Sequence, residues 1–269
     1  MSDNPLVTVV IPTYNRPDHL RRALASVLDQ KGVIQEVIVV DDASDLDMSD
    51  ELEKYPQVTY LRNAKNMGGG YARNRGLQAA KGTYINFLDD DDEFLDGKLR
   101  KQVHQFEISD IAPLGMVSCH LRDLRSGKEV LLRNKCRGDI YKASLQGYTV
   151  NGTPSMLFKT EAVRYIGGFD ETLPANQEYD LIIRFSKHYG VDYVDEVLAR
   201  ANRSVGQIHS NFEKKRDGAI RLFDKYDNDY RKIGFAFRLK MRIKLVILLF
   251  RFWIGKRFGE KAYRMLLKK

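Results

Sequence analysis

Cysteines are rare in this chain, and it lacks long apolar runs. The two cysteines, Cys119 and Cys136, do not have the spacing of a metal site. No segment before the first expected strand resembles a signal peptide, so we expect a reducing compartment and a cytoplasmic protein. The apolar run Leu245–Phe250 has only six residues before Arg251, far short of the roughly 20 that cross a bilayer.

The chain also lacks the glycine-rich phosphate loops of two large classes of nucleotide-binding protein. No G-x-G-x-x-G follows an expected strand, which argues against a dinucleotide-dependent oxidoreductase. A sugar nucleotidyltransferase needs a glycine-rich loop with arginine or lysine directly after its first strand. The sequence has Pro12-Thr13-Tyr14-Asn15 at that place, so we keep this class only as an alternative.

Acidic residues are scarce in the last part of the chain. From Arg231 to Lys269 there are 13 lysines and arginines and a single acid, Glu260. The whole chain has a formal net charge of +8, so residues 1–230 are net acidic. A nucleic-acid-binding domain would have a basic folded face, and we therefore expect no nucleic-acid partner. A basic end on an acidic body suits contact with an anionic membrane surface.

Apolar periodicity predicts an α/β fold for the first 110 residues. Leu6–Ile11 is an apolar run typical of a buried parallel strand, and apolar residues then recur at helical spacing from Leu20 to Leu28. We expect Asp18 to cap this helix and Gly32 to close it. The alternation continues with strands at Val33–Val40, Val58–Leu61 and Thr83–Leu88, and with helices at Tyr71–Ala80 and Lys98–Ile108.

This alternation predicts an open, mostly parallel, Rossmann-like sheet with helices on both faces, followed by a more varied second part. A loose alternation around Ser126-Gly127 predicts a hairpin over Leu121–Asn134. Helices are expected at Thr160–Ile166 and Glu178–His188. We divide the chain into a nucleotide-binding half (1–110), an acceptor half (111–230) and a basic, amphipathic helical tail (231–269).

Polar side chains follow three of the expected strands at their carboxyl ends. They are Pro12-Thr13-Tyr14-Asn15, Asp41-Asp42-Ala43-Ser44 and Asp89-Asp90-Asp91-Asp92. Ligands of open α/β sheets bind at this edge, so all three segments should face one crevice. Four consecutive carboxylates repel one another unless a cation offsets their charge. Oxygen ligands favour Mg²⁺ or Mn²⁺, completed by water and substrate phosphates.

Five motifs follow one another along the chain. They are VTVVIPTYNRPDHLRRALASVLDQ, VIVVDDAS, NMGGGYARNRGLQAAKGTYINFLDDDD, IGGFDE and QEYDLIIRF. Together they resemble the family 2 glycosyltransferases with the GT-A fold, over roughly residues 5–200. The resemblance implies a bacterial enzyme of polysaccharide or lipopolysaccharide synthesis. Such an enzyme would move a sugar from a nucleotide-diphosphate donor, expected to be a UDP-sugar, to a glycan or lipid-linked glycan, with inversion at the anomeric carbon.

The resemblance assigns nucleotide contacts to the first two strand ends and to an arginine. Within Pro12–Asn15, Thr13 and Tyr14 would line the base pocket, with the Tyr14 ring against the base. Asp42 would accept the base N–H, while Asp41 could instead be structural. Arg73 matches the family arginine near the nucleotide, and a guanidinium suits a phosphate or ribose contact.

Within the aspartate run, the Asp-x-Asp element of the family matches Asp89 and Asp91. Asp91 is the predicted metal ligand, and Asp89 is assigned to ribose or to a metal-bound water. Asp90 fills the variable position on the nucleotide side, and Asp92 would support the ligands from behind. His209 lies in a segment that often closes over the donor, and it is a further candidate for the metal or the diphosphate. A lone histidine is more often a surface or core residue.

Inverting transfer needs a carboxylate that takes the proton from the acceptor hydroxyl. The family places a Glu-Asp pair at the start of a helix, and the second acid is the base. This chain has Gln177-Glu178 there, which makes Glu178 the predicted base and Asp180 the second choice. Both acids would also favour a helix N-terminus without any catalysis. A chain that had lost its base would be a non-catalytic nucleotide-sugar-binding subunit.

Aromatic side chains lie among lysines and arginines near the end of the chain. Phe250, Phe252, Trp253 and Phe258 have this pattern, which is typical of a segment in a membrane interface. The alternation in Phe237–Leu245, however, spreads charge around a helix, so packing on the catalytic domain or on a partner chain is the alternative. We expect a peripheral protein on the inner face of the cell membrane.

Overall fold

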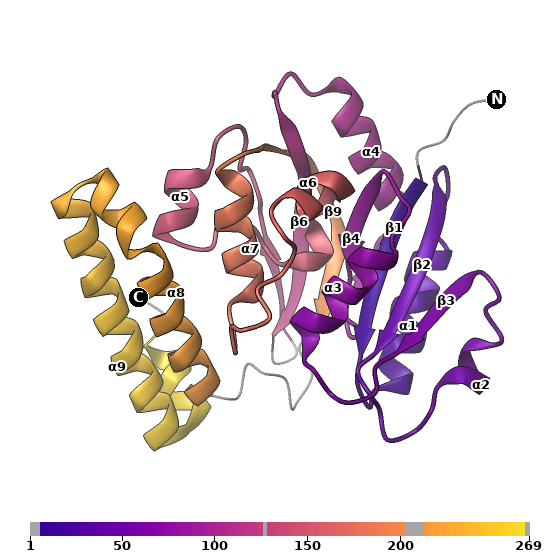
Figure 1. Cartoon of the computed structure of the whole chain (residues 1–269), viewed down its shortest axis with the longest axis horizontal. Helices are drawn as coiled ribbons and strands as arrows, with labels where there is room; N and C mark the ends of the chain where they lie inside the picture. The colour runs from indigo at the N-terminus through magenta and orange to yellow at the C-terminus, as the bar shows by residue number, and fades with distance from the viewer. Residues whose placement is uncertain (1–5, 126–127, 203–211, 267–269) are drawn as a thin grey trace.

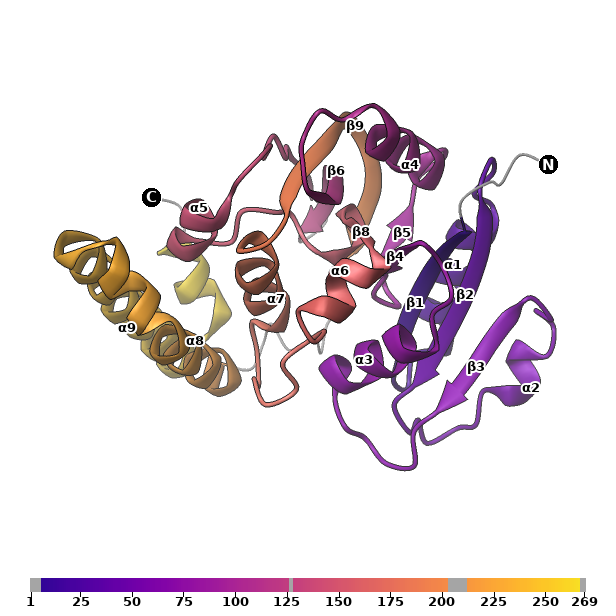
Figure 2. The same cartoon turned by 45° about the horizontal axis from the view of Figure 1, so that its top comes forward.

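Residues 6–125, 128–202 and 212–266 are described by the computed structural model of the chain (Figure 1). Within these ranges a nine-stranded sheet has the order β3-β2-β1-β4-β8-β6-β9-β5, and β7 pairs with β6. Helices cover both faces of the sheet, and two long helices lie at one end of the molecule (Figure 1, Figure 2). The predicted α/β class is confirmed.

The N-terminal unit is the predicted strand, helix and strand. β1 (Leu6–Thr13) pairs in parallel with β2 (Ile34–Asp41), and α1 (Pro17–Leu28) connects them. Neighbouring residues of β1 are buried on opposite faces: Val9 shares a core cluster with α1, and Val10 shares another with α3 (Gly69–Ala79). Burial on both faces explains why the strand is almost wholly apolar.

The ends of α1 differ from the predicted ones. The helix begins at Pro17, whose fixed φ and missing N–H suit a first helical position, and Arg16 precedes it without a side-chain cap. Asp18 does not cap the helix, because its carboxylate pairs with Arg21 Nη1 at 2.5 Å. Gly32 does not close it either: α1 has already ended, and Gly32, with φ +81°, lies in the turn before β2.

The parallel part of the sheet continues on both sides of β1 and β2. β3 (Val58–Arg62) pairs with β2, and β4 (Tyr84–Phe87) pairs with β1, both in parallel. α2 (Ser49–Leu52) is a single turn before β3. Gly76 of α3 lies directly over β1, since a Cβ there would be 2.3 Å from Val10 Cγ1. This glycine therefore allows α3 to pack closely on the sheet and to cover the edge formed by the carboxyl ends of the parallel strands.

The second half of the chain joins the same sheet. β8 (Leu157–Lys159) pairs antiparallel with β4 and with β6 (Leu114–Arg125), and β6 pairs in parallel with β9 (Gly190–Asn202). β5 (Glu93–Phe94) lies antiparallel to β9, and β7 (Lys128–Leu132) forms the predicted hairpin with β6. Residue 110 thus does not separate two sheets, and the strands after it make the sheet mixed.

The helices of the second half agree closely with the sequence. α4 (Lys98–Ile108) has the predicted bounds, and α6 (Thr160–Tyr165) and α7 (Gln177–Ser186) lie within two residues of theirs. The short α5 (Tyr141–Gln146) and the 3₁₀ turn η1 (Thr153–Ser155) were not predicted.

The chain ends in a pair of long helices. α8 (Phe212–Ile233) and α9 (Phe235–Met265) are joined at Gly234, which has φ +138°. Ile183 of α7 and Leu222 of α8 belong to one core cluster, so the pair is packed on the catalytic part. The helical unit therefore begins at Phe212, and the predicted boundary at 231 falls inside α8. None of the helices within the described ranges has the length and apolar character needed to cross a membrane.

Candidate active site

The carboxyl ends of β1, β2 and β4 lie side by side, and we call their residues the polar edge. Thr13 Oγ1, at the end of β1, donates a hydrogen bond to Asp90 Oδ2 after β4 at 2.9 Å. The backbone N–H of Asp42, after β2, donates to the carbonyl oxygen of Thr13 at 2.9 Å. The three polar segments therefore meet, as the parallel order predicts.

The loop after β1 is held by Asn15, whose backbone is left-handed with φ +56°. Its N–H donates to Ser44 Oγ at 2.9 Å, and its side chain exchanges two hydrogen bonds with Asp45. Asparagine tolerates this conformation better than most residues. Asn15 thus joins the loops after β1 and β2 and leaves the Tyr14 ring 43% exposed. Pro12 lies within β1 itself.

Asp41 is buried and closes the turn after β2. Its carboxylate accepts hydrogen bonds from the N–H and hydroxyl of Ser44, at 2.9 and 2.6 Å, and from the Tyr60 hydroxyl at 2.8 Å. These contacts correspond to the structural role that the sequence left open for Asp41.

Asp42 is also buried, and it holds the loop that leads into α3. Oδ1 accepts from Asn63 Nδ2 at 2.7 Å and from the Met67 N–H at 2.9 Å, while Oδ2 accepts from the Gly68 N–H at 2.6 Å. A carboxylate oxygen can accept two hydrogen bonds. Oδ2 accepts one hydrogen bond from the described part of the chain and can therefore accept a base N–H as well.

Arg73 connects the aspartate run to the start of α7. Its Nη2 lies 2.5 Å from Asp89 Oδ1 and 3.7 Å from Glu178 Oε1, and its guanidinium lies 5.4 Å from the centre of the Phe169 ring. Its Nε is buried without a hydrogen-bond partner among the described residues. Burial opposes the charge, but the charges of Asp89 and Glu178 raise the pKa of Arg73 above its ordinary value. Arg73 therefore remains a cation between two acids.

The aspartate run divides into two groups. One carboxylate oxygen from each of Asp89, Asp91 and Asp92 lies within 4.8 Å of the other two. Asp90 is turned away from them, toward the end of β1. Asp92 thus offers an oxygen beside the two predicted acids, whereas only a supporting role was predicted for it. His209, the remaining metal candidate, lies outside the described residues.

Burial and repulsion raise the pKa values of two acids in the run. Burial, helped by the charges of Asp91 and Asp89, raises the pKa of Asp90 to about 6 against the opposing effects of Thr13 and Arg16. Burial and the same two charges raise the pKa of Asp92 well above its ordinary value. A bound cation favours the charged forms of carboxylates. The run therefore has the electrostatics of a cation site.

Two residues at the polar edge were missed by the sequence analysis. Arg16 Nη1 lies 3.4 Å from Asp90 Oδ1 and 3.3 Å from Asp91 Oδ2. Asn202, at the end of β9, donates its N–H to Asp92 Oδ1 at 3.0 Å and its Nδ2 to the Asp91 carbonyl at 2.9 Å. Arg16 directly follows a strand-end motif, which was an available signal. Asn202 belongs to the segment that the family resemblance places over the donor, but the sequence assigned this residue no role.

Glu178 lies in the first turn of α7, which follows the left-handed Asn176. Tyr148 donates its hydroxyl to Glu178 Oε2 at 3.4 Å. The side chain is 30% exposed, so an acceptor hydroxyl can reach it. Burial and the charge of Asp89 raise the pKa of Glu178, although Arg73 and Tyr148 oppose them. The acid predicted as base is therefore partly exposed, and its pKa is raised above the ordinary value.

Asp180 does not share this position, and its place as second choice for the base is corrected. Its carboxylate is fully buried, with Arg184 Nε at 2.7 Å, Lys225 Nζ at 2.7 Å and the Tyr226 hydroxyl at 2.8 Å. Residues two apart on a helix do not face the same side. Asp180 therefore faces α8 and fixes the helical pair to α7.

This placement predicts a structural effect for Asp180→Asn. Removing the charge leaves Arg184 and Lys225 without their shared acid, and we expect a loss of about 2–4 kcal/mol in the free energy of unfolding. The measurement is urea unfolding followed by circular dichroism. Because Asp180 does not face Glu178, kcat of the folded fraction should stay within about twofold of wild type, and a kcat loss without destabilisation would contradict this assignment.

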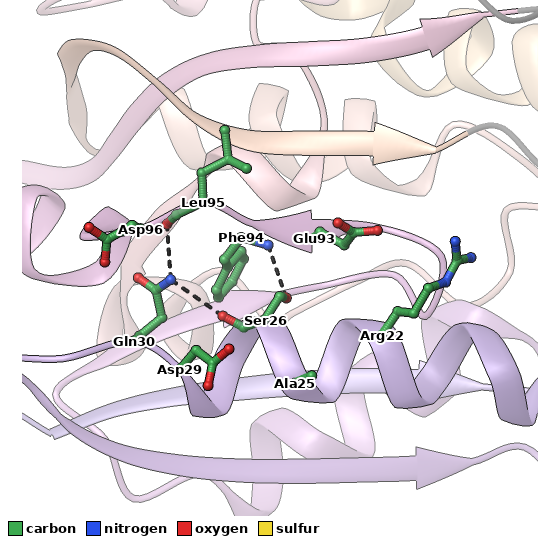
Figure 3. Close-up of a pocket in the computed structure, with 9 residues that line it drawn as sticks. All are labelled: Arg22, Ala25, Ser26, Asp29, Gln30, Glu93, Phe94, Leu95 and Asp96. Atoms are coloured by element: carbon green, nitrogen blue, oxygen red, sulfur yellow. Dashed lines mark hydrogen bonds between the residues drawn. The ribbon is translucent and has the colours of Figure 1, made fainter.

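A cavity of about 440 Å³ lies between α1 and β5, and none of the predicted donor residues is among those that line it (Figure 3). Its polar groups are used to join the two elements: Gln30 Nε2 donates to the Leu95 carbonyl at 2.9 Å, and the Phe94 N–H donates to Ser26 Oγ at 3.1 Å. The cavity is lined by Arg22, Ala25, Ser26, Asp29, Gln30, Glu93, Phe94, Leu95 and Asp96.

Comparison with protein families decides the class of this site. The model of the family described as Glycosyl transferase family 2 matches residues 8–157, more than half of the chain. The chain belongs to this family. It is thus a glycosyltransferase, and the polar edge from β1 to the aspartate run lies wholly within the matched range.

Two bacterial relatives illustrate the similarity. One is WcaA of Escherichia coli, provisionally named a colanic acid biosynthesis glycosyl transferase. It is 28% identical over 264 residues, covering 89% of this chain and 88% of that protein. TuaG of Bacillus subtilis, provisionally named for teichuronic acid biosynthesis, is 41% identical over 105 residues, or 37% of this chain and 41% of that protein. Relatives of this glycosyltransferase thus belong to polysaccharide biosynthesis.

Solved structures confirm the GT-A fold. The mannosyltransferase PcManGT of Pyrobaculum calidifontis, in complex with GDP-Man and Mn²⁺, aligns with a TM-score of 0.63 and 19% identity over 99% of this chain and 75% of that chain. Residues 1–349 of Staphylococcus aureus TarS, in complex with UDP-GlcNAc, align with a TM-score of 0.62 and 19% identity over 80% of this chain and 65% of that chain.

Proposed function

We propose that this family 2 glycosyltransferase uses a divalent cation to transfer a sugar from a UDP-sugar to a glycan or lipid-linked glycan, with inversion at the anomeric carbon. The observation that carries the proposal is the position of Arg73 between Asp89 and Glu178. Through Arg73, the acids suited to hold a metal and its diphosphate lie next to an acid suited to accept a proton.

The donor nucleotide would lie along the ends of β1 and β2. The exposed Tyr14 ring can stack on the base, and Asp42 Oδ2 can accept a base N–H. Thr13 fixes Asp90, while Asp89, which is 34% exposed, can reach the ribose or a metal-bound water. The two solved neighbours contain UDP-GlcNAc and GDP-Man, so the choice of UDP rests on the family resemblance.

The aspartate run fits a divalent cation. Its three clustered carboxylates offer hard oxygen ligands, as Mn²⁺ and Mg²⁺ prefer. Asp91 is the proposed principal ligand, and Asp89 and Asp92 complete the set. When bound, the cation would neutralise negative charge that develops on the leaving diphosphate. Arg16, which contacts Asp91, would turn toward the diphosphate as the cation takes its place.

Glu178 is the proposed general base. Its carboxylate takes the proton of the acceptor hydroxyl while the hydroxyl oxygen bonds to the anomeric carbon and the bond to the diphosphate breaks. Arg73 and Tyr148 contact different oxygens of Glu178, which limits the rotation of the carboxylate. Attack from the face opposite the leaving group gives inversion.

A screen of nucleotide-sugars by thermal shift, with and without Mn²⁺, tests this function. A donor present at 100 times its Kd should stabilise the protein by about 2.7 kcal/mol, and we expect this only with the cation and most strongly for UDP-sugars. Binding without transfer or hydrolysis would indicate the non-catalytic subunit. Turnover of a nucleoside triphosphate with a sugar phosphate would indicate the nucleotidyltransferase. No binding of any nucleotide-sugar would overturn the proposal.

A further inference from the structure

The outer face of α9 is apolar and exposed although the helix is packed on α8. Leu239, Ile243, Val246, Phe250 and Trp253 are between 47% and 65% exposed. Their spacing of four, three, four and three residues places them in one stripe along the helix. We call these five residues the α9 stripe; at about 1.5 Å per residue it is ~21 Å long.

The opposite face of α9 accounts for its attachment to the protein. Met241 and Phe252 are buried, and Gly255 lies against Phe212 of α8, since a Cβ there would be 2.6 Å from the Phe212 ring. After the non-helical Gly259 the chain turns back, and the Tyr263 ring stacks on Phe252 at 5.9 Å. The α9 stripe is therefore not needed to hold α9 in place.

Basic residues border the α9 stripe on both sides. At 100° per residue, Arg242 lies about 20° beyond one edge of the stripe, and Lys240 and Arg251 lie about 60–80° beyond the other. Arg257 follows near the Trp253 end and is exposed. No acid occurs between Phe235 and Gly259. The sequence predicted basic residues all around the helix. In the structure, they lie on the two sides of an apolar centre.

We propose that the α9 stripe and its basic margins bind the surface of a membrane that contains anionic phospholipids. The helix would lie in the plane of the interface, with the stripe among the upper acyl chains and the arginines and lysines at the headgroups. Tryptophan and phenylalanine are well suited to this depth.

A second copy of the chain is the other possible occupant, because the spacing also resembles that of a coiled-coil seam. Charge argues against it. The charged residues on both sides of the stripe would be basic in both copies, with no acid on α9 before Gly259 to pair with them. Like charges beside such a seam repel, whereas an anionic surface attracts each nearby lysine or arginine.

A membrane bound to the α9 stripe would also orient the proposed active site. Lys244 Nζ donates to the Gln146 carbonyl at 2.7 Å, which ties α9 to the end of α5. Two residues further on, Tyr148 contacts Glu178. In both views the order across the molecule is α9, α8, α7 and then the parallel strands (Figure 1, Figure 2). α7, which carries the proposed base, therefore lies between the helical pair and the parallel strands. A membrane bound to α9 would hold the proposed active site in a fixed orientation to the surface, which suits a lipid-linked acceptor; this last step rests on the proposed function.

Trp253 is the only tryptophan of the chain, so its fluorescence reports on the stripe directly. On mixing the full chain with phosphatidylglycerol–phosphatidylcholine vesicles, we expect a blue shift of the emission and flotation with the vesicles. Pure phosphatidylcholine vesicles should bind at least about tenfold more weakly, and 1 M salt should weaken binding to the anionic vesicles. Equal binding to both vesicles, or none to either, would overturn the proposal.

Variants separate the two parts of the surface. Ile243→Ser with Phe250→Ser should weaken vesicle partitioning on the order of 10²-fold, and Arg242→Gln with Arg257→Gln by about 30-fold. The matched controls are Leu46→Ser with Ile108→Ser, at exposed apolar positions elsewhere, and Lys81→Gln with Arg133→Gln. If the controls lose as much as the α9 variants, the surface is wrongly assigned. Circular dichroism checks that each variant is folded.

The same samples distinguish a second copy from a membrane and from a failed enzyme proposal. A blue shift that grows with protein concentration without vesicles, together with a dimer mass by sedimentation, would replace the membrane by a second copy. The α9 variants should keep donor hydrolysis within about twofold of wild type, because they do not touch the polar edge. Asp91→Asn should float like wild type, so loss of activity and loss of membrane binding are separate results.

Discussion

Replacing Glu178 with glutamine is expected to lower kcat for glycosyl transfer by about 10²–10⁴-fold, with little change in donor affinity. The amide has nearly the same shape as the carboxylate but cannot take a proton from the acceptor hydroxyl. Since the side chain is partly exposed and makes only long contacts with Arg73 and Tyr148, the fold should be preserved. Steady-state kinetics, with Tm measured in parallel, checks both expectations.

The conservative variant and a pH profile test the same role. Glu178→Asp restores an acid of the type that the family carries at this position, and it should regain at least tenfold over Glu178→Gln. Because burial and Asp89 raise the pKa of Glu178, the ionised base is lost on acidification at a higher pH than for an ordinary glutamate. The acidic limb of the pH profile of kcat should therefore lie at a higher pH than for an ordinary glutamate. Glu161→Gln, at an exposed acid of α6, is the control; full transfer by Glu178→Gln would assign the base elsewhere.

Asp91→Asn is expected to abolish the effect of the cation and to lower transfer by on the order of 10³-fold. The substitution removes one of the three clustered carboxylates. It also removes a charge that raises the pKa values of Asp90 and Asp92. The Tm of the metal-free protein should therefore stay the same or rise, while the rise in Tm on adding Mn²⁺ should disappear.

The Tm values measured without and with Mn²⁺ do not depend on turnover, so they test the site even when no acceptor is known. Asp50→Asn, at an exposed position in α2, is the matched control and should retain the shift with Mn²⁺. A normal shift in Asp91→Asn would mean that the cation binds elsewhere. Mn²⁺ and Mg²⁺ can be compared in the same assay.

The neighbouring acids of α7 show where prediction from sequence reached its limit. The family motif directed attention to the start of the helix, and helical spacing alone indicates that Glu178 and Asp180 face different sides. Which side meets the aspartate run depends on the packing of α8 against Asp180, and α8 begins more than thirty residues later. No local pattern contains that information.

The sequence by itself determined the alternation of strands and helices in the parallel part of the sheet and the edge at which the polar strand ends meet. These follow from local periodicity and from the geometry that all parallel sheets share. Only the tertiary structure decided which aspartates cluster, that Arg16, Arg73 and Asn202 contact them, and which face of α9 is left exposed. Such choices depend on contacts between residues far apart in the chain, since the partners of a side chain are set by how the helices pack on the sheet.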